Sequence, residues 1–320
     1  MLYRSGPWLR WVVAACFAAA PLAMAADIFL APRLTLETGY ELNRFATASA
    51  LTNSEDVAFL RATPALDLHF LCANGSELAL GSSGHRTEYF STSSESRDGA
   101  EAHLEWWYTA VPVEGGLRLA GGMARDAALP ENDFRWVAAV PSLRYALPAP
   151  AWQLTAQARL DFVDYDSRVN AAGDPQRDAA WEFRPGLRWL PSRAFSLWSA
   201  FILETCDSND DTASYAGAGC AWGASYWLTP RDQFAASFQV GTRTFDEAFD
   251  DAGTEFDRRD VPMYVAVYYS RRVCPWLELF CSAGWETTGS NLAGQDVDTA
   301  ALQIGATLAQ DFELFSSGLR

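Results

Sequence analysis

Residues 152–162 read WQLTAQARLDF, and this stretch decides the fold class. Its even-numbered positions, from Trp152 to Phe162, are all apolar, whereas its odd-numbered positions hold Gln, Thr, Arg and Asp. Successive side chains of a β-strand point to opposite faces of the sheet, so this segment is predicted to be a strand with one apolar and one hydrophilic face. Segments 28–43, 234–241 and 277–285 show the same two-residue period.

Alternating segments of this kind recur along the whole chain, about fourteen times. An even number of strands is what a single-chain bacterial outer-membrane barrel requires when both ends of the chain lie on one side. The strands are expected at 28–44, 56–71, 77–90, 100–112, 117–126, 134–147, 152–165, 179–190, 194–206, 215–228, 233–246, 261–272, 276–288 and 299–312.

The connections between the expected strands alternate in length. Six are short and hold Gly, Pro or Asn, as at 72–75 and 148–150, and seven are long, polar and mostly acidic, as at 166–178 and 247–260. We therefore predict an all-β fold: a closed antiparallel up-and-down transmembrane β-barrel of about 14 strands, with short periplasmic turns and long outer loops. Periodicity alone leaves open a soluble all-β protein.

The N-terminal residues have the pattern of a secretory signal peptide. Arg4 and Arg10 precede an apolar stretch that ends at Met24, and the small residue Ala25 fits a cleavage site. This stretch is too short to cross a bilayer comfortably, and we find no unbroken apolar run of 18 residues after it. We expect residues 1–25 to be a signal peptide and residues 26–320 to form the barrel.

The composition excludes two broad classes of protein. The 320 residues carry a formal net charge of −16, and all 24 basic residues are arginine. Such an acidic chain is a poor partner for the phosphates of nucleic acids, so no nucleic-acid partner is expected. A hydrophobic fraction of 49% and an aromatic fraction of 13% are too high for a disordered chain.

Aromatic residues and prolines recur at set places along the expected strands. Aromatics beside the short turns predict a girdle at the membrane interface, although strands are enriched in aromatics in general. They are Tyr145, Trp152, Trp189, Tyr226, Trp227 and Trp276. Proline cannot donate a ladder hydrogen bond, so each proline that opens an alternating run predicts a bulge or an outer rim beyond the ladder. These prolines are Pro64, Pro141, Pro185 and Pro262.

From Ile28 onward the chain resembles the porin-like outer-membrane β-barrel proteins of Gram-negative bacteria. Gln303, Gly305 and Leu308 resemble this family's C-terminal assembly signal, although Gln310 departs from it and Phe312 or Phe315 stands in for the terminal aromatic residue. The resemblance implies a bacterial outer-membrane location. It also implies outer-membrane lipid, lipopolysaccharide and the barrel-assembly machinery as partners.

The hydrophilic positions of the strands predict the barrel interior. Arginines gather on the sixth to eighth strands and acids on the early and late ones. This arrangement allows either a transverse field across a water-filled pore or a salt-bridge network that holds the barrel shut. The candidate pore-lining residues are Arg33, Glu37, Glu41, Asp67, Glu105, Arg118, Arg144, Arg159, Asp161, Arg184, Arg188, Glu204, Arg243, Glu278 and Glu286, with His69, Glu77 and His103 on the same face.

Three further features are weaker candidates for a site. Asp207, Asp210 and Asp211 are weak candidate ligands for a loop-bound divalent cation such as calcium, and a solvated acidic loop explains them better. Cys206 and Cys220 flank a long loop and are a candidate disulfide, but their parity places them on opposite faces of the sheet. We find no other cofactor pattern.

The sequence leaves three functions open. The first is a passive channel for small hydrophilic solutes or ions. The second is a non-conducting structural, assembly or partner-binding protein. The third, an outer-membrane lipid hydrolase, has the least support, because no serine-centred motif accompanies the three histidines. We therefore expect no catalytic residues.

Overall fold

The computed structural model describes residues 25–42, 56–72, 74–90, 96–127, 133–149, 151–170, 172–246, 257–292 and 296–316. These residues form fifteen β-strands and one short 3-10 helix, Asp211–Ala213. The predicted signal peptide falls almost entirely on residues 1–24, outside the described residues. The strands are β1 (Ala25–Leu42), β2 (Val57–Cys72), β3 (Ser76–Tyr89), β4 (Ser96–Ala110), β5 (Val113–Asp126), β6 (Phe134–Ala146), β7 (Trp152–Val169), β8 (Pro175–Ser192), β9 (Phe195–Ser208), β10 (Tyr215–Thr229), β11 (Asp232–Phe245), β12 (Arg259–Cys274), β13 (Leu277–Ser290), β14 (Val297–Ala309) and β15 (Phe312–Ser316).

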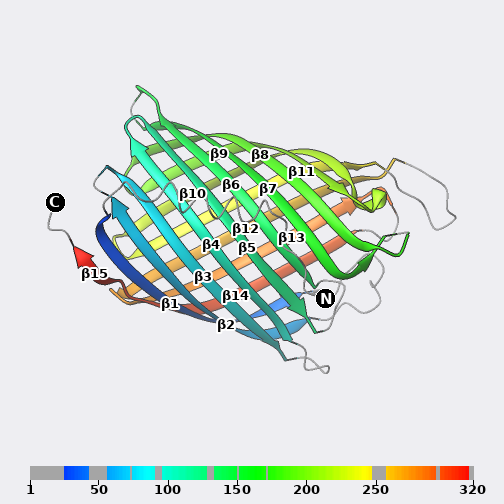
Figure 1. Cartoon of the computed structure of the whole chain (residues 1–320), viewed down its shortest axis with the longest axis horizontal. Helices are drawn as coiled ribbons and strands as arrows, with labels where there is room; N and C mark the ends of the chain where they lie inside the picture. The colour runs from blue at the N-terminus through cyan, green and yellow to red at the C-terminus, as the bar shows by residue number, and fades with distance from the viewer. Residues whose placement is uncertain are drawn as a thin grey trace.

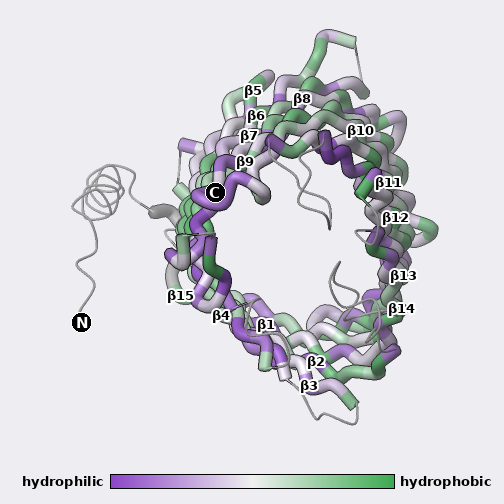
Figure 2. The backbone as a smooth tube through the Cα atoms, turned by 90° about the vertical axis from the view of Figure 1, so that its right-hand side faces the viewer, coloured by the Kyte–Doolittle hydropathy of each residue, from purple (hydrophilic) through white to green (hydrophobic). Residues whose placement is uncertain are grey.

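The first fourteen strands form one closed antiparallel barrel. Each strand pairs with its neighbour in the chain, and β14 pairs with β1 from Arg33↔Ala309 to Leu42↔Ala300, which closes the sheet. Figure 1 shows the strands tilted along the barrel, and Figure 2 shows the ring that they form. The predicted fold class and strand number are confirmed, and the short turns and the longer connections lie at opposite ends of the barrel.

The end of the chain differs from the expectation of a single last strand at 299–312. β14 ends at Ala309, and the separate strand β15 pairs with Asp27–Leu30 at the start of β1. The break lies opposite Pro32 of β1, which has no N–H group to donate to a continuing ladder. The carbonyl oxygen of Pro32 still accepts a 3.3 Å hydrogen bond from the Gln310 N–H group.

The apolar face of each strand points outward. Leu154, Phe162 and Ile304 keep 47%, 59% and 58% of their surface exposed, as expected of side chains that would face lipid. Some of the aromatic rings near the turns meet in a row on this outer face. Trp152 stacks on Trp189 at 5.8 Å between ring centroids, and the row runs on through Phe195.

Each of the four prolines lies at a gap in one ladder rather than at a bulge. The pairing of β2 with β3 skips Thr63 and Pro64, yet it resumes in the same register, from Ala62↔Arg86 to Ala65↔Ser83. The same kind of gap occurs at Pro141 in the pairing of β6 with β7, at Pro185 in that of β8 with β9, and at Pro262 in that of β11 with β12. The expected bulge is therefore wrong, because the missing donor interrupts the ladder without shifting it.

Among the described residues, no helix is long and apolar enough to cross a membrane.

Candidate functional site

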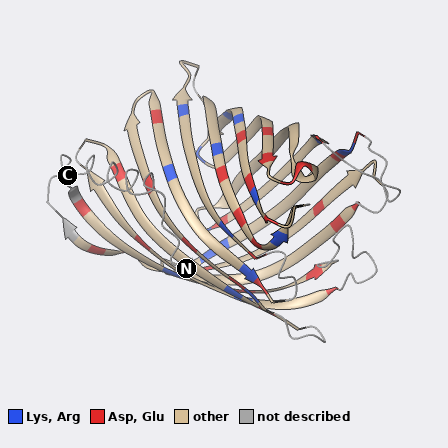
Figure 3. Cartoon of the chain, turned by 45° about the vertical axis from the view of Figure 1, so that its right-hand side comes forward, with Lys and Arg blue, Asp and Glu red and all other residues tan. Residues whose placement is uncertain are grey.

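The fifteen predicted interior residues all lie on the strand face opposite the exposed apolar side chains. On β1, for example, Leu36 and Tyr40 are exposed on the outer face, and Glu37 and Glu41 alternate with them. Figure 3 shows that the charged residues are spread over many strands of the barrel. The alternation places the predicted residues inside the barrel, and their role in conduction stays a prediction.

One interior cluster joins β1, β2 and β3 around Arg61. The Arg61 guanidinium donates a 2.8 Å hydrogen bond to Glu37 and another of 2.8 Å to the hydroxyl of Thr87, and it lies 3.7 Å from Glu41. It also lies 5.0 Å from the ring centre of Phe59, which is fully buried. Arg61 therefore places a positive charge beside two of the predicted pore-lining carboxylates.

A second cluster crosses the interior face from β2 to β5. His103 lies 3.5 Å from Asp67 and 3.8 Å from Glu101, and Glu101 also accepts a short hydrogen bond from Arg118. A Cβ atom on Gly81, the β3 residue between Asp67 and His103, would overlap both side chains. The glycine is what lets these two side chains meet across β3.

The arginines of β6 to β8 do not form a bare positive wall. Arg144 donates a 3.0 Å hydrogen bond to Glu114 and lies 5.1 Å from the ring centre of Trp107. Two others, Arg159 and Arg184, are each hydrogen-bonded to a carboxylate two residues away on the same strand, at 2.6 Å to Asp161 and at 2.7 Å to Glu182. Local pairing therefore weakens a transverse field of the kind the sequence suggested.

The remaining predicted interior residues have mixed surroundings. Arg33 lies 3.6 Å from Asp67, and Glu204 accepts two hydrogen bonds from Arg243. Glu105 accepts a short hydrogen bond from the indole of Trp107, and Glu278 accepts one of 3.1 Å from Tyr268. Within the described part of the chain, Arg188 and Glu286 have no ion pair within 4.0 Å.

Sequence reasoning missed several interior charges that complete these clusters. Four of them lie within the expected strands at the parity of a predicted neighbour, as Glu182 does with Arg184, so the strand pattern could have found them. The other two, Arg97 and Glu114, lie outside the expected strands 100–112 and 117–126. The missed charges are Arg61, Arg97, Glu101, Glu114, Asp126 and Glu182.

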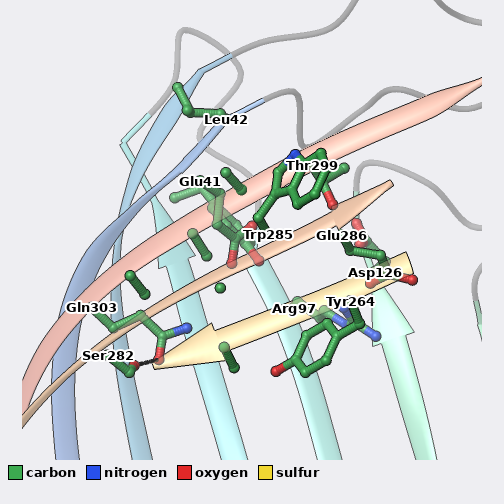
Figure 4. A pocket seen from close by; sticks show the side chains of 16 residues that line it. Glu41, Leu42, Arg97, Asp126, Tyr264, Ser282, Trp285, Glu286, Thr299 and Gln303 are labelled. Atoms are coloured by element: carbon green, nitrogen blue, oxygen red, sulfur yellow. Dashed lines mark hydrogen bonds between the residues drawn. The ribbon is translucent and has the colours of Figure 1, made fainter. Parts of the chain in front are cut away.

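A cavity of about 470 Å³ lies inside the barrel, toward the end with the long connections. Figure 4 shows Glu41, Arg97, Asp126, Tyr264 and Glu286 around it. They come from β1, β4, β5, β12 and β13, so the cavity spans the interior between two parts of the wall.

The candidate disulfide is not formed. Cys206 and Cys220 are both free thiols. Cys206 pairs with Tyr215 on the inner face of the sheet, whereas Cys220 pairs with Phe201 on the outer face. The two side chains point away from each other, as their parity indicated.

The weak candidate cation ligands do not converge. Asp210 caps the 3-10 helix by accepting hydrogen bonds from the backbone and hydroxyl of Thr212. No group of three or more His, Cys, Asp or Glu side chains in the described ranges is placed to hold a metal ion. Most of the long acidic connection 247–260, namely residues 247–256, lies outside those ranges.

Two of the three histidines lie beside carboxylates on the inner face. His69 is 2.8 Å from Glu77, and His103 contacts the carboxylates of Asp67 and Glu101. His85, also on the inner face, contacts the backbone at Gly99, where a Cβ atom would overlap its ring. That the chain has no catalytic residues stays a prediction.

No family model and no curated protein matches the chain in sequence. Outer-membrane expressed OmpT of Vibrio cholerae is similar in structure, with a TM-score of 0.52 and 8% identity, over 88% of this chain and 97% of that one. The outer membrane channel DcaP of Acinetobacter baumannii has a TM-score of 0.49 and 8% identity, over 89% and 97%. The anion-selective porin from Comamonas acidovorans has a TM-score of 0.48 and 8% identity, over 89% and 99%. The first likeness shows that the chain has the fold of bacterial outer-membrane β-barrels.

Proposed function

We propose that this barrel is a passive outer-membrane channel for small hydrophilic solutes or ions. The observation that carries the proposal is the polar cavity of about 470 Å³ inside a closed fourteen-strand sheet. A barrel of this strand number lies between the eight-strand barrels that side chains fill and the larger porins that hold water. Glycine and alanine at inward positions such as Gly284 and Ala301 leave room beside the charged groups.

The location belongs to the same proposal. An outward apolar surface and an aromatic row near the turns suit a barrel that spans a bilayer. We infer that the chain reaches the outer membrane of a Gram-negative cell by its signal peptide, is inserted by the barrel-assembly machinery, and contacts lipid and lipopolysaccharide. Cell fractionation tests this location, and recovery of the chain as a soluble periplasmic protein would contradict it.

Single-channel recording tests the channel. The folded full chain, inserted into a planar lipid bilayer in concentrated KCl, is expected to give discrete current steps. Ala301→Trp places a large ring in the cavity and is expected to lower the step size, whereas the adjacent Leu302→Trp changes a side chain that is 59% exposed on the outer face and should leave it unchanged.

The same recordings also test the competing function. The ion-pair clusters of the interior favour a barrel that is held shut, which would act as a structural or partner-binding protein. A barrel that is folded by its heat-modifiable electrophoretic mobility, yet gives no current steps, would reject the channel in favour of this second function.

A further inference from the structure

The interior cavity is bordered by two rows of polar side chains on different parts of the wall. In the first row, Tyr264, Glu286 and Thr299 are directly paired across β12, β13 and β14. In the second row, Arg97 and Asp126 are directly paired across β4 and β5. All five residues line the same cavity (Figure 4).

The charges around this cavity are of both signs, with an excess of acid. Glu286 and Asp126 contribute carboxylates from the two rows, and Glu41 adds a third that Arg61 approaches to 3.7 Å. Arg97 is the guanidinium among the described residues that line the cavity. Over the described ranges, neither Glu286 nor Arg97 has an ion pair within 4.0 Å, unlike most of the interior charges described above.

Neutral hydrogen-bonding groups complete the lining. The phenol of Tyr264 and the hydroxyl of Thr299 flank Glu286, and Ser282 and Gln303 lie deeper, joined by a 3.4 Å hydrogen bond. Carboxylates accept hydrogen bonds from ammonium or guanidinium groups, and a guanidinium fork matches a carboxylate. The cavity therefore presents a partner for each end of a molecule that carries both kinds of charge.

We propose that this cavity is a binding subsite for a small organic cation that also carries a carboxylate, of the type of a basic amino acid. Glu286, assisted by Asp126 and Glu41, holds the cationic group, and Arg97 holds the carboxylate. The excess of acid over base favours a ligand with net positive charge. This inference rests on the proposed channel function, because it names the solute class that the interior takes.

Three probes test the contributions of the cationic group and of the carboxylate separately. L-Arginine carries both groups, agmatine has the same guanidinium but no carboxylate, and L-glutamate has net negative charge. We expect L-arginine to interrupt the single-channel current with the highest apparent affinity and L-glutamate to have little effect. Glu286→Gln is expected to weaken L-arginine about tenfold, the effect of losing one charge-assisted hydrogen bond.

A second variant, at Arg97, tests the contact with the ligand's carboxylate. Arg97→Gln is expected to weaken L-arginine by a similar factor and to leave agmatine unchanged. Glu278→Gln is the matched control, because Glu278 lies on the same face of β13 as Glu286 but does not line the cavity. Equal affinity of the wild type for all three probes, or equal effects of Glu286→Gln and Glu278→Gln, would overturn the subsite.

Isothermal titration of the detergent-solubilised barrel with L-arginine separates this inference from the channel itself. Binding without current steps would reject conduction and keep the subsite. Current steps with neither binding nor interruption by L-arginine would reject the subsite and keep the channel.

Discussion

The guanidinium of Arg243 on β11 reaches across β10 to the carboxylate of Glu204 on β9. Its Nε donates to Oε1 at 2.8 Å and its Nη2 to Oε2 at 3.1 Å. Gly217 is the β10 residue paired with both, and a Cβ atom there would lie 2.8 Å from Glu204 Oε1. The missing side chain makes room for the pair, and the ring of Tyr215 lies 4.8 Å from the Arg243 guanidinium.

Arg243→Met tests the contribution of this pair to stability. The change leaves Glu204, whose side chain is 14% exposed, without its charged partner. We expect a loss of about 1–3 kcal/mol in the free energy of unfolding, measured by urea titration of the barrel in lipid vesicles with tryptophan fluorescence. Arg86→Met is the control, because its side chain is 63% exposed beside Glu88 and such a pair contributes about 0–1 kcal/mol. Equal losses in the two variants would contradict the argument.

The closure of the barrel depends on a second glycine, Gly305 on β14. A Cβ atom at this position would lie 2.7 Å from the Leu36 carbonyl oxygen and would overlap the ring of Phe280. We expect Gly305→Ala to cost about 1–3 kcal/mol through overpacking at the β14–β1 seam. The measure is the urea midpoint, together with the fraction of heat-modifiable folded barrel on electrophoresis.

The matched control for the seam is Gly284→Ala on β13. There the nearest atom to a new Cβ, the Val265 carbonyl oxygen, is 3.9 Å away. Alanine is entropically better than glycine in a strand, so this variant should be neutral or slightly stabilised. A loss at Gly284→Ala as large as that at Gly305→Ala would show that steric crowding at the seam is not the cause.

The fold was predictable because the two-residue period recurs along the chain, most clearly at Trp152–Phe162, and a one-residue slip there would turn the apolar side chains inward. The same parity placed all the candidate charges on the inner face and Cys206 and Cys220 on opposite faces. What parity cannot give is the partner of each charge, since it carries no register between strands. Three features follow from cross-strand pairing, which only the closed sheet defines. They are the Arg61 cluster, the room that Gly217 leaves for the Arg243–Glu204 pair, and the break between β14 and β15 opposite Pro32.

The cysteines provide a chemical test of the two faces. Cys206 is 8% exposed on the inner face, and Cys220 is on the outer face. We expect both to remain free when the folded barrel is oxidised mildly, because their Cβ vectors point apart and a disulfide needs a narrow geometry. Mass spectrometry after alkylation measures this, with the urea-unfolded chain under the same oxidant as control. A Cys206–Cys220 peptide from the folded barrel would refute the assignment of faces.

Arg61 is expected to set part of the ion preference of the interior. It lies on β2, 2.8 Å from Glu37 and 3.7 Å from Glu41 on the neighbouring strand β1. Arg61→Gln removes a positive charge from beside both carboxylates, so a conducting barrel should become more selective for cations. If the loss of this charge favours K⁺ over Cl⁻ by about 1 kcal/mol in total, the permeability ratio of K⁺ to Cl⁻ should rise by about fivefold. The reversal potential in a KCl gradient measures this ratio. Arg86→Gln, on the outer face, should not change it, and a shift of Arg61→Gln toward anions would contradict the assigned pairing.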